Sequence, residues 1–148
     1  MTIARSLDPT AESPTEFYVA STLPVGGSVS LRNDKRPFGF NIGDARFAEE
    51  EFAAVARIIG YTPARAVHVY AFINADVDHK ILGELAVFFA RQVRGLIDFG
   101  GHLGDVGVPR GTLLQVPYMA GSIPAALHVS DVTFLEWWLT QRRFHMIK

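Results

Sequence analysis

Four titratable side chains in the second half of the chain are candidates for acid–base chemistry: His79, Glu84, Asp98 and His128. Histidine titrates near neutral pH, and a carboxyl group with a shifted pKa can act beside it as a general acid or base. Such a set would suit a small hydrolase or transferase. His79 and Glu84 are five residues apart, which is about 140° around a helix, so a single helix would point them in different directions. This chemistry therefore requires the fold to bring at least two of the four into one concave pocket.

The motifs of metal, serine and phosphate chemistry do not occur in the sequence. There are five histidines but no pair at the i, i+4 spacing of helical metal ligands, and there is no cysteine. Ser122 lacks the second glycine of a G-x-S-x-G nucleophile motif. The glycines of residues 100–111 are not followed by the Lys-Ser/Thr pair of a phosphate-binding loop. We therefore expect no metal and no cofactor.

Other polar and aromatic side chains are better suited to contact a protein partner. They are an acidic run, the polar residues in and just before the glycine-rich loop of residues 100–111, and a tryptophan near the C-terminus: Glu49, Glu50, Glu51, Asp98, His102, Asp105 and Trp137. Ordinary turn chemistry explains the loop residues equally well. Partial burial explains Trp137 as well as exposure at an interface does. We predict a partner surface among these residues.

The composition is that of an ordinary soluble domain, with 148 residues of which 49% are apolar and 20% charged. Fourteen basic and fifteen acidic side chains give a formal net charge of -1, so no global field draws the chain to nucleic acid or to a membrane surface. There is no signal-peptide pattern and no apolar run of about 18 residues. Because cysteine is absent, we expect a reducing compartment, the cytoplasm. Residues 1–15 are expected to be a flexible lead-in, and residues 16–148 a single domain.

Apolar periodicity predicts the elements that would position these side chains. In the first third, alternation predicts a hairpin of strands at residues 17–23 and 29–31, with a third strand near residues 37–42. A helix is predicted at residues 46–59, with Asp44 as its N-cap.

The middle of the chain predicts a strand and a long helix. Residues 66–73 are apolar on both alternating faces, which is typical of a central strand covered on both sides. The clearest helix spans residues 77–94, with Asp76 or Asp78 as its N-cap and its end before Gly95. The remaining predicted elements are a short strand at 96–99, the glycine-rich loop at 100–111, strands at 112–118 and 125–129, and a helix at 131–141. Because hairpins impose antiparallel neighbours, we expect an α+β domain with a mixed, mainly antiparallel sheet and about three helices packed on it.

The second half, roughly residues 66–148, resembles a family of small bacterial proteins of unknown function. The resemblance lies in the sequences HKILGELAVFFARQVRGLIDFGG, LLQVPY, ALHVSDVTFLEWWL and FHMIK, with matching positions at His79, Gly83, Glu84, Asp98, Phe99, Gly100 and Gly101. Such proteins look like immunity proteins of polymorphic or type VI-delivered toxin systems. The resemblance implies a non-enzymatic bacterial protein that occludes the active site of a cognate, co-encoded toxin. The alternative is the small hydrolase or transferase described above, and a homodimer is compatible with either function.

Overall fold

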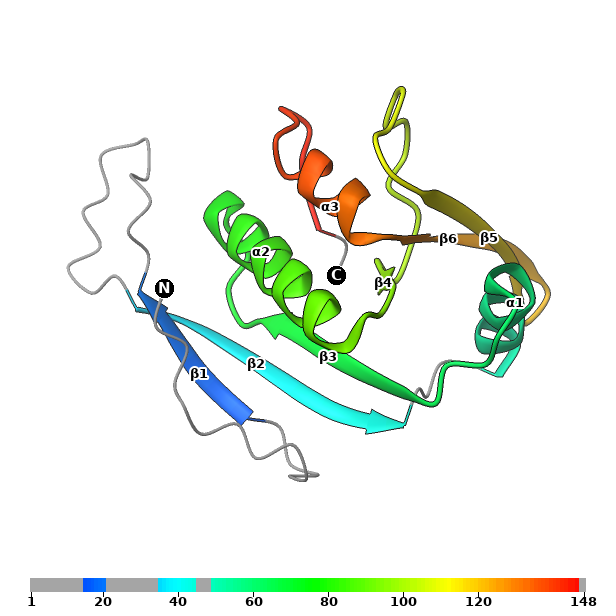
Figure 1. The fold of residues 1–148 in the computed structure, drawn as a ribbon, viewed down its shortest axis with the longest axis horizontal. Helices are drawn as coiled ribbons and strands as arrows, with labels where there is room; N and C mark the ends of the chain where they lie inside the picture. The colour runs from blue at the N-terminus through cyan, green and yellow to red at the C-terminus, as the bar shows by residue number, and fades with distance from the viewer. Residues whose placement is uncertain (1–14, 21–34, 45–48, 147–148) are drawn as a thin grey trace.

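The computed structural model describes residues 15–20, 35–44 and 49–146 of the chain. Within these ranges the chain forms six strands and three helices (Figure 1). In order along the chain they are β1 (Thr15–Ala20), β2 (Lys35–Asp44), α1 (Glu49–Ile59), β3 (Arg65–Ala71), α2 (Asp76–Val93), β4 (Ile97–Asp98), β5 (Leu113–Ala120), β6 (Ile123–Ser130) and α3 (Val132–Trp138). The predicted α+β class with three helices is confirmed.

The strands divide into two three-stranded sheets. The first has the order β1-β2-β3 and the second the order β4-β6-β5, and every neighbouring pair is antiparallel. In Figure 1, α2 lies over the first sheet, while α1 and α3 lie with the second. The two sheets arise because the chain, after crossing α2, pairs β4 with β6 and not with β3.

The N-terminal third differs from the predicted hairpin. β1 pairs with β2, with Thr15 opposite Phe40 and Ala20 opposite Lys35. The predicted strand at residues 29–31 and nearly all of the predicted lead-in lie outside the described residues. Asp44 is the last residue of β2, opposite Arg65, and so belongs to a strand where we expected a helix cap.

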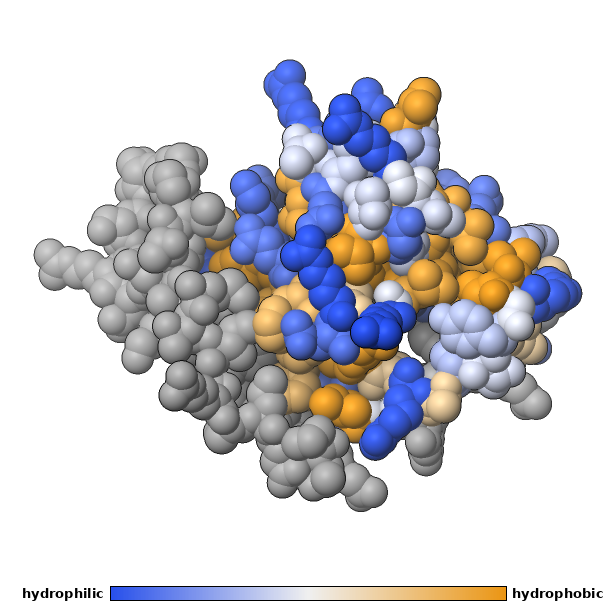
Figure 2. Space-filling model, in the orientation of Figure 1, coloured by the Kyte–Doolittle hydropathy of each residue, from blue (hydrophilic) through white to orange (hydrophobic). Residues whose placement is uncertain are grey.

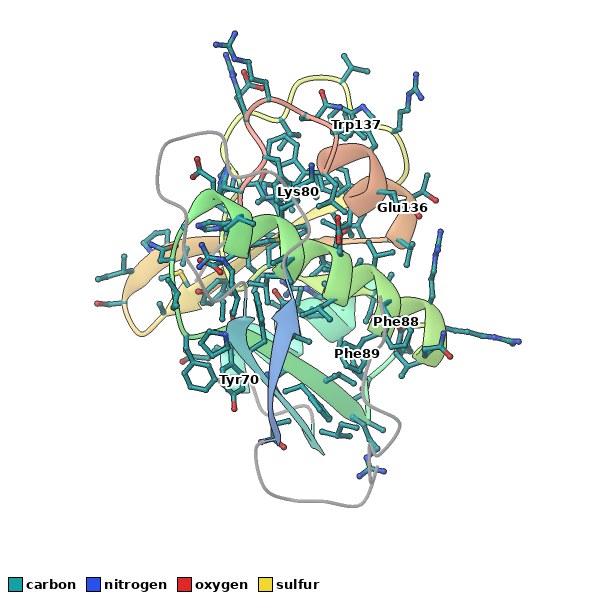
Figure 3. All side chains as sticks on the ribbon, turned by 90° about the vertical axis from the view of Figure 1, so that its left-hand side faces the viewer. Tyr70, Lys80, Phe88, Phe89, Glu136 and Trp137 are labelled. Atoms are coloured by element: carbon teal, nitrogen blue, oxygen red, sulfur yellow. The ribbon has the colours of Figure 1, made fainter. Side chains whose placement is uncertain are left out.

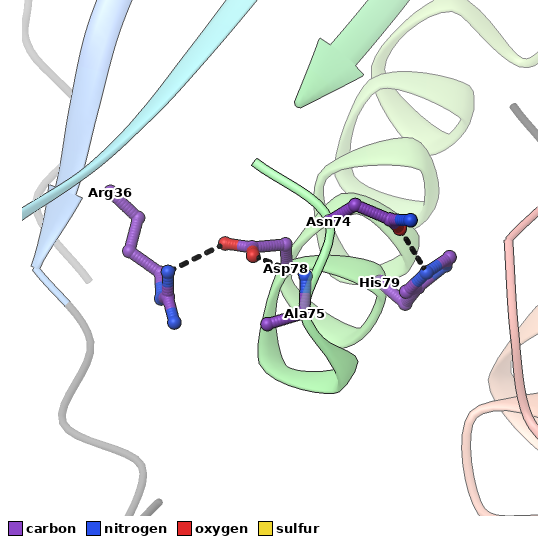
Figure 4. Close-up of polar contacts among 5 residues, drawn as sticks. All are labelled: Arg36, Asn74, Ala75, Asp78 and His79. Atoms are coloured by element: carbon purple, nitrogen blue, oxygen red, sulfur yellow. Dashed lines mark hydrogen bonds and ion pairs between the residues drawn. The ribbon is translucent and has the colours of Figure 1, made fainter. Parts of the chain in front are cut away.

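The start of α2 is stabilised from inside the helix. Its N-cap is Ala75, and neither Asp76 nor Asp78 occupies that position. Asp78 instead accepts a hydrogen bond from the Ala75 N–H at 2.8 Å through Oδ2, and its Oδ1 lies 3.3 Å from Arg36 Nη1 of β2 (Figure 4). This carboxylate therefore caps the helix and ties it to the first sheet. The predicted end before Gly95 is confirmed, since Arg94 takes a left-handed conformation at the C-cap with φ 52°.

The described core forms three clusters around these elements. Phe38, Ile81 and Leu85 pack α2 on the first sheet. Val55 with Val116, Leu127 and Val129 packs α1 on the second sheet. The largest cluster joins α2, α3, β4 and the loop that follows it: Val87, Ala90, Ile97, Phe99, Leu103, Phe134, Leu135, Trp138 and Met146. Figure 3 shows Phe89 on the side of α2 that faces the first sheet, where its ring lies 5.5 Å from that of Phe40.

β3 is an edge strand, which corrects the prediction of a central one. Its single strand neighbour in the described chain is β2. None of residues 65–71 is buried, and Phe72 and Ile73 just beyond are 52% and 46% exposed. Tyr70, labelled in Figure 3, lies across Gly39 of β2, where any added Cβ would overlap its ring. An apolar strand thus borders open space on one side.

Among the described helices, none combines the length and apolar character that crossing a membrane requires.

Candidate binding cavity

A cavity of about 1180 Å³ lies beside the edge of β3 that has no strand neighbour among the described residues, which we call the free edge of β3. It is lined by every residue from 63 to 74 and by every residue from 93 to 100. A strand that presents only one face to a cavity would contribute alternate residues. Continuous lining along both segments therefore means that the cavity runs between the edge of β3 and the segment that contains β4. We call this space the slot.

The walls of the slot are mainly apolar. Besides β3, they include side chains of α1, α2, β6 and the C-terminal segment: Val55, Ile59, Leu82, Ala86, Phe89, Ala90, Val129 and Met146. In the space-filling view, hydrophilic side chains border the gap beside α1, and apolar side chains lie above it and at its lower left (Figure 2). Its volume exceeds the range of about 300–1,000 Å³ that is usual for small-molecule pockets.

Asp98, in β4, places a carboxylate in this apolar wall. Its Oδ1 accepts a hydrogen bond from the Gly100 N–H at 2.7 Å. Its Oδ2 is buried and has no hydrogen-bond partner among the described residues. Burial raises the pKa of this carboxyl above its ordinary value, and the Gly100 hydrogen bond and the nearby charge of His68 oppose that shift. His68 lies at the middle of β3 and lines the slot together with Asp98.

His79 also lines the slot, but both of its ring nitrogens are engaged, and Figure 4 shows the contact with Asn74. The Met146 N–H donates to Nδ1 at 3.1 Å. Nε2 therefore carries the proton of the neutral ring and donates to Asn74 Oδ1 at 2.8 Å. These two hydrogen bonds tie the C-terminal segment and the loop before α2 to the helix.

The other two acid–base candidates lie elsewhere. Glu84 is exposed on α2, and His128 is buried in β6 outside the slot lining. The Leu103 N–H donates to His128 Nδ1 at 2.9 Å. Burial lowers the pKa of His128, and the charge of His102, with its ring 4.3 Å away, lowers it further. The fold thus brings His79 and Asp98 to one cavity and leaves the other two outside it. In the described ranges no group of three His, Asp or Glu side chains could hold a metal ion.

The predicted partner-binding residues are spread over α1, β4, the glycine-rich loop and α3, and of the six whose side chains are described only Asp98 lines the slot. Glu50 is exposed and Glu51 half-buried on α1, while the side chain of Glu49 lies outside the described set. His102 Nδ1 accepts from the Gly104 N–H and Asp105 Oδ1 from the Gly107 N–H, each at 2.9 Å. Trp137 is half-buried, with its ring 5.6 Å from that of Phe134. Turn formation and packing thus account for the geometry of His102, Asp105 and Trp137.

The slot itself was not predicted from the sequence. The signal was the two-sided apolar pattern of residues 66–73, which we assigned to cover by neighbouring strands. In the structure one of those neighbours is missing among the described strands, and the slot lies in its place.

The fold and the slot define a small α+β protein with a large, mainly apolar cavity between two antiparallel sheets. The chain belongs to the family of unknown function DUF6368, whose model matches residues 1–148. No curated protein and no solved structure matches the chain.

Proposed function

We propose that this protein binds a cognate bacterial toxin and blocks its active site, in the manner of the immunity proteins that its second half resembles. The observation that carries the proposal is β3, an apolar strand with a free edge on an open slot. Exposed apolar surface of this kind is characteristic of interaction sites. The slot would supply the apolar centre of an interface, and α1 and the glycine-rich loop would supply its polar rim.

Tight inhibition of this kind uses an interface on the order of 1,600 Å². If the toxin has a basic active site, the exposed carboxylates of Glu50 and Asp105 would accelerate association and add specificity. The proposal therefore assigns two tasks to different side chains: the slot holds the partner, and the rim carboxylates steer it.

Co-expression with the product of the neighbouring open reading frame tests this proposal. We expect this protein to restore growth that the neighbouring product inhibits, and we expect the two proteins to co-purify. A neighbouring product that remains toxic, and that does not co-purify with this protein at equal expression, would contradict it.

The rival function is a small hydrolase or transferase. One observation favours it: His79 and Asp98 line the same cavity, and the pKa of Asp98 is raised. Against it, both nitrogens of His79 hold neighbouring segments in place. Turnover of ester, phosphoester or acyl-transfer substrates by the purified protein, abolished in both His79→Gln and Asp98→Asn, would establish the rival and overturn our proposal.

A further inference from the structure

The sequence of β3 lacks two features that often protect a free strand edge. Edge strands are usually shielded by lysine, proline, a bulge or an inward-pointing charge. The sequence of β3, RAVHVYA, contains neither lysine nor proline, and its arginine stands at the first position. About half of the backbone N–H and C=O groups of an edge strand point away from its one neighbour. Along β3 these groups border the slot.

Those backbone groups indicate what kind of occupant would fit. A purely apolar ligand would cover the side chains but would leave the backbone donors and acceptors without partners. An extended peptide satisfies both requirements, because its backbone pairs with the strand edge and its alternate side chains fill apolar space. A strand pairs at about 4.8 Å from its neighbour.

Asp98 indicates that the occupant of the slot should also carry a positive charge. Asp98 lines the slot, and its Oδ2 is buried and has no hydrogen-bond partner among the described residues. A lysine or arginine side chain from the occupant would give that oxygen its missing partner and would neutralise the carboxylate. His68, at the middle of β3, lines the same slot as Asp98, so a strand added along β3 would pass both residues.

We infer that an extended segment of a partner protein inserts into the slot as an added strand, pairs with the free edge of β3, and places a basic side chain against Asp98. The inserted strand would lie between the two sheets and extend the first one. This inference rests on the proposed function for the identity of the partner, and it adds the mode of binding and the chemistry of the bound segment.

The inference can be tested without the toxin, using a synthetic probe. The probe is a capped peptide of seven alternating valine and threonine residues with lysine at its centre, a length that matches the seven residues of β3. Residue-resolved amide exchange by NMR on the full chain, with about 1 mM peptide, reads out binding. Strand addition predicts new protection at alternate amides of residues 65–71. A matched peptide with glutamate at its centre should bind at least about tenfold more weakly.

Two variants test whether Asp98 causes the preference for the lysine peptide over the glutamate peptide. Asp98→Asn keeps an acceptor for the Gly100 N–H and should remove the preference for lysine over glutamate. Asp105→Asn is the matched control, because Asp105 makes the same type of turn with the Gly107 N–H but lies outside the slot. That control should retain the full preference. A lysine preference that persists in Asp98→Asn would overturn the role of Asp98.

The other occupants give different results, and each overturns the inference. Absence of peptide binding, or a peptide with N-methylated alternate amides that binds equally well, would exclude strand pairing. Hexylamine that binds as tightly as the peptide would assign the slot to a small amine. The β3 amides that point toward β2 are protected in every state, so only the amides that point away from β2 are informative. Protection of those amides in the free protein would indicate a second copy if it depends on protein concentration, and the chain itself if it does not.

The outcomes also separate this inference from the proposed function. A toxin complex that leaves the β3 amides unprotected would retain the immunity function and reject strand addition. Peptide binding as described, with no toxin captured by co-expression, would support strand addition and reject the immunity function.

Discussion

At the scale of single residues, Asp98 is the side chain whose placement is hardest to explain by stability. A buried acceptor without a partner costs on the order of 1–3 kcal/mol, and this one lies in an apolar wall. Polar groups that destabilise the fold are frequently found where a ligand binds. The free molecule is therefore expected to be less stable than it would be with a neutral side chain at this position.

We predict that Asp98→Asn stabilises the protein at about pH 7 by roughly 1 kcal/mol. Because the pKa of Asp98 is raised by burial, the fold favours the protonated carboxyl. The destabilisation is absent below the ordinary value of 3.8, grows as the pH rises through the folded pKa, and is complete above it. Urea unfolding of the wild type and of Asp98→Asn, below pH 3.8 and at about pH 7, measures the difference in free energy of unfolding. A variant that is less stable than the wild type at about pH 7 would contradict the prediction.

His128 makes stability depend on pH in the opposite direction. Its neutral Nδ1 accepts the Leu103 hydrogen bond, and burial followed by the charge of His102 lowers its pKa from 6.5. Stability contributed by the neutral ring is complete above 6.5 and is lost as the pH falls below that value toward the folded pKa. We predict that His102→Gln, which removes one cause of the shift, reduces the loss of thermal stability between about pH 8 and about pH 5. Identical pH profiles for the two proteins would contradict this.

At the scale of elements, the junction between the glycine-rich loop and α3 depends on two residues. Asp131 caps α3 by accepting from the Phe134 N–H at 2.8 Å, and its other oxygen accepts from the Thr112 N–H at 2.9 Å. Gly111 has φ +80° at this point, and a Cβ there would overlap the Phe134 nitrogen. Only glycine allows the loop to approach the helix this closely.

We predict that Gly111→Ala destabilises the protein by at least about 2 kcal/mol, since backbone strain and steric overlap both contribute. Gly107→Ala is the matched control, with φ +71° but nothing within 4 Å of an added Cβ. It should cost only about 1 kcal/mol from strain. Denaturant midpoints compare the two, and equal losses would show that the close approach at Gly111 is unimportant.

Elements with strong local signals were predictable from the sequence. The periodicity of α2, its end before Gly95 and the end of the α1 helix at residue 59 are all local, and the structure confirms them. α3 ends earlier than predicted because the chain after Trp138 continues in tighter turns, with the Thr140 N–H bonded to the Trp137 carbonyl. β3 could not be placed correctly, because whether a strand lies at an edge depends on partners far away in the sequence.

The candidate site was predictable only in part, for the same reason. Asp98 was among the candidates, both as a partner-facing residue just before the glycine-rich loop and as one of four acid–base side chains that a pocket would have to bring together, but no pattern placed it beside β3. Asp98 in β4 is separated from β3 in the sequence by α2, an 18-residue helix, and the two segments meet only in the folded chain. Local patterns carry no information about that distance in space. The hydrogen bonds that occupy both nitrogens of His79 likewise come from Met146 and Asn74, and no spacing rule predicts them.

At the scale of the whole molecule, the first sheet is tied to α2 by a buried ion pair. Arg36 and Asp78 have side chains that are 10% and 2% exposed. Removing one charge leaves the other buried and unpaired, so we predict that Asp78→Asn costs about 3 kcal/mol. The exposed pair of Arg91 and Glu136, which joins α2 to α3, is the control, and Glu136→Gln should change stability by less than about 1 kcal/mol. Equal effects in urea unfolding would deny Arg36 and Asp78 this structural role.

The arrangement of the two sheets and the slot between them is the basis of our proposal that the molecule receives an extended partner. The most direct test is the affinity of the purified protein for the product of the neighbouring gene, compared with the affinities of Asp98→Asn and Asp105→Asn. The account predicts tight binding by the wild type and by Asp105→Asn, and a loss of about tenfold or more in Asp98→Asn. Equal binding by all three proteins, or binding by none, would contradict it.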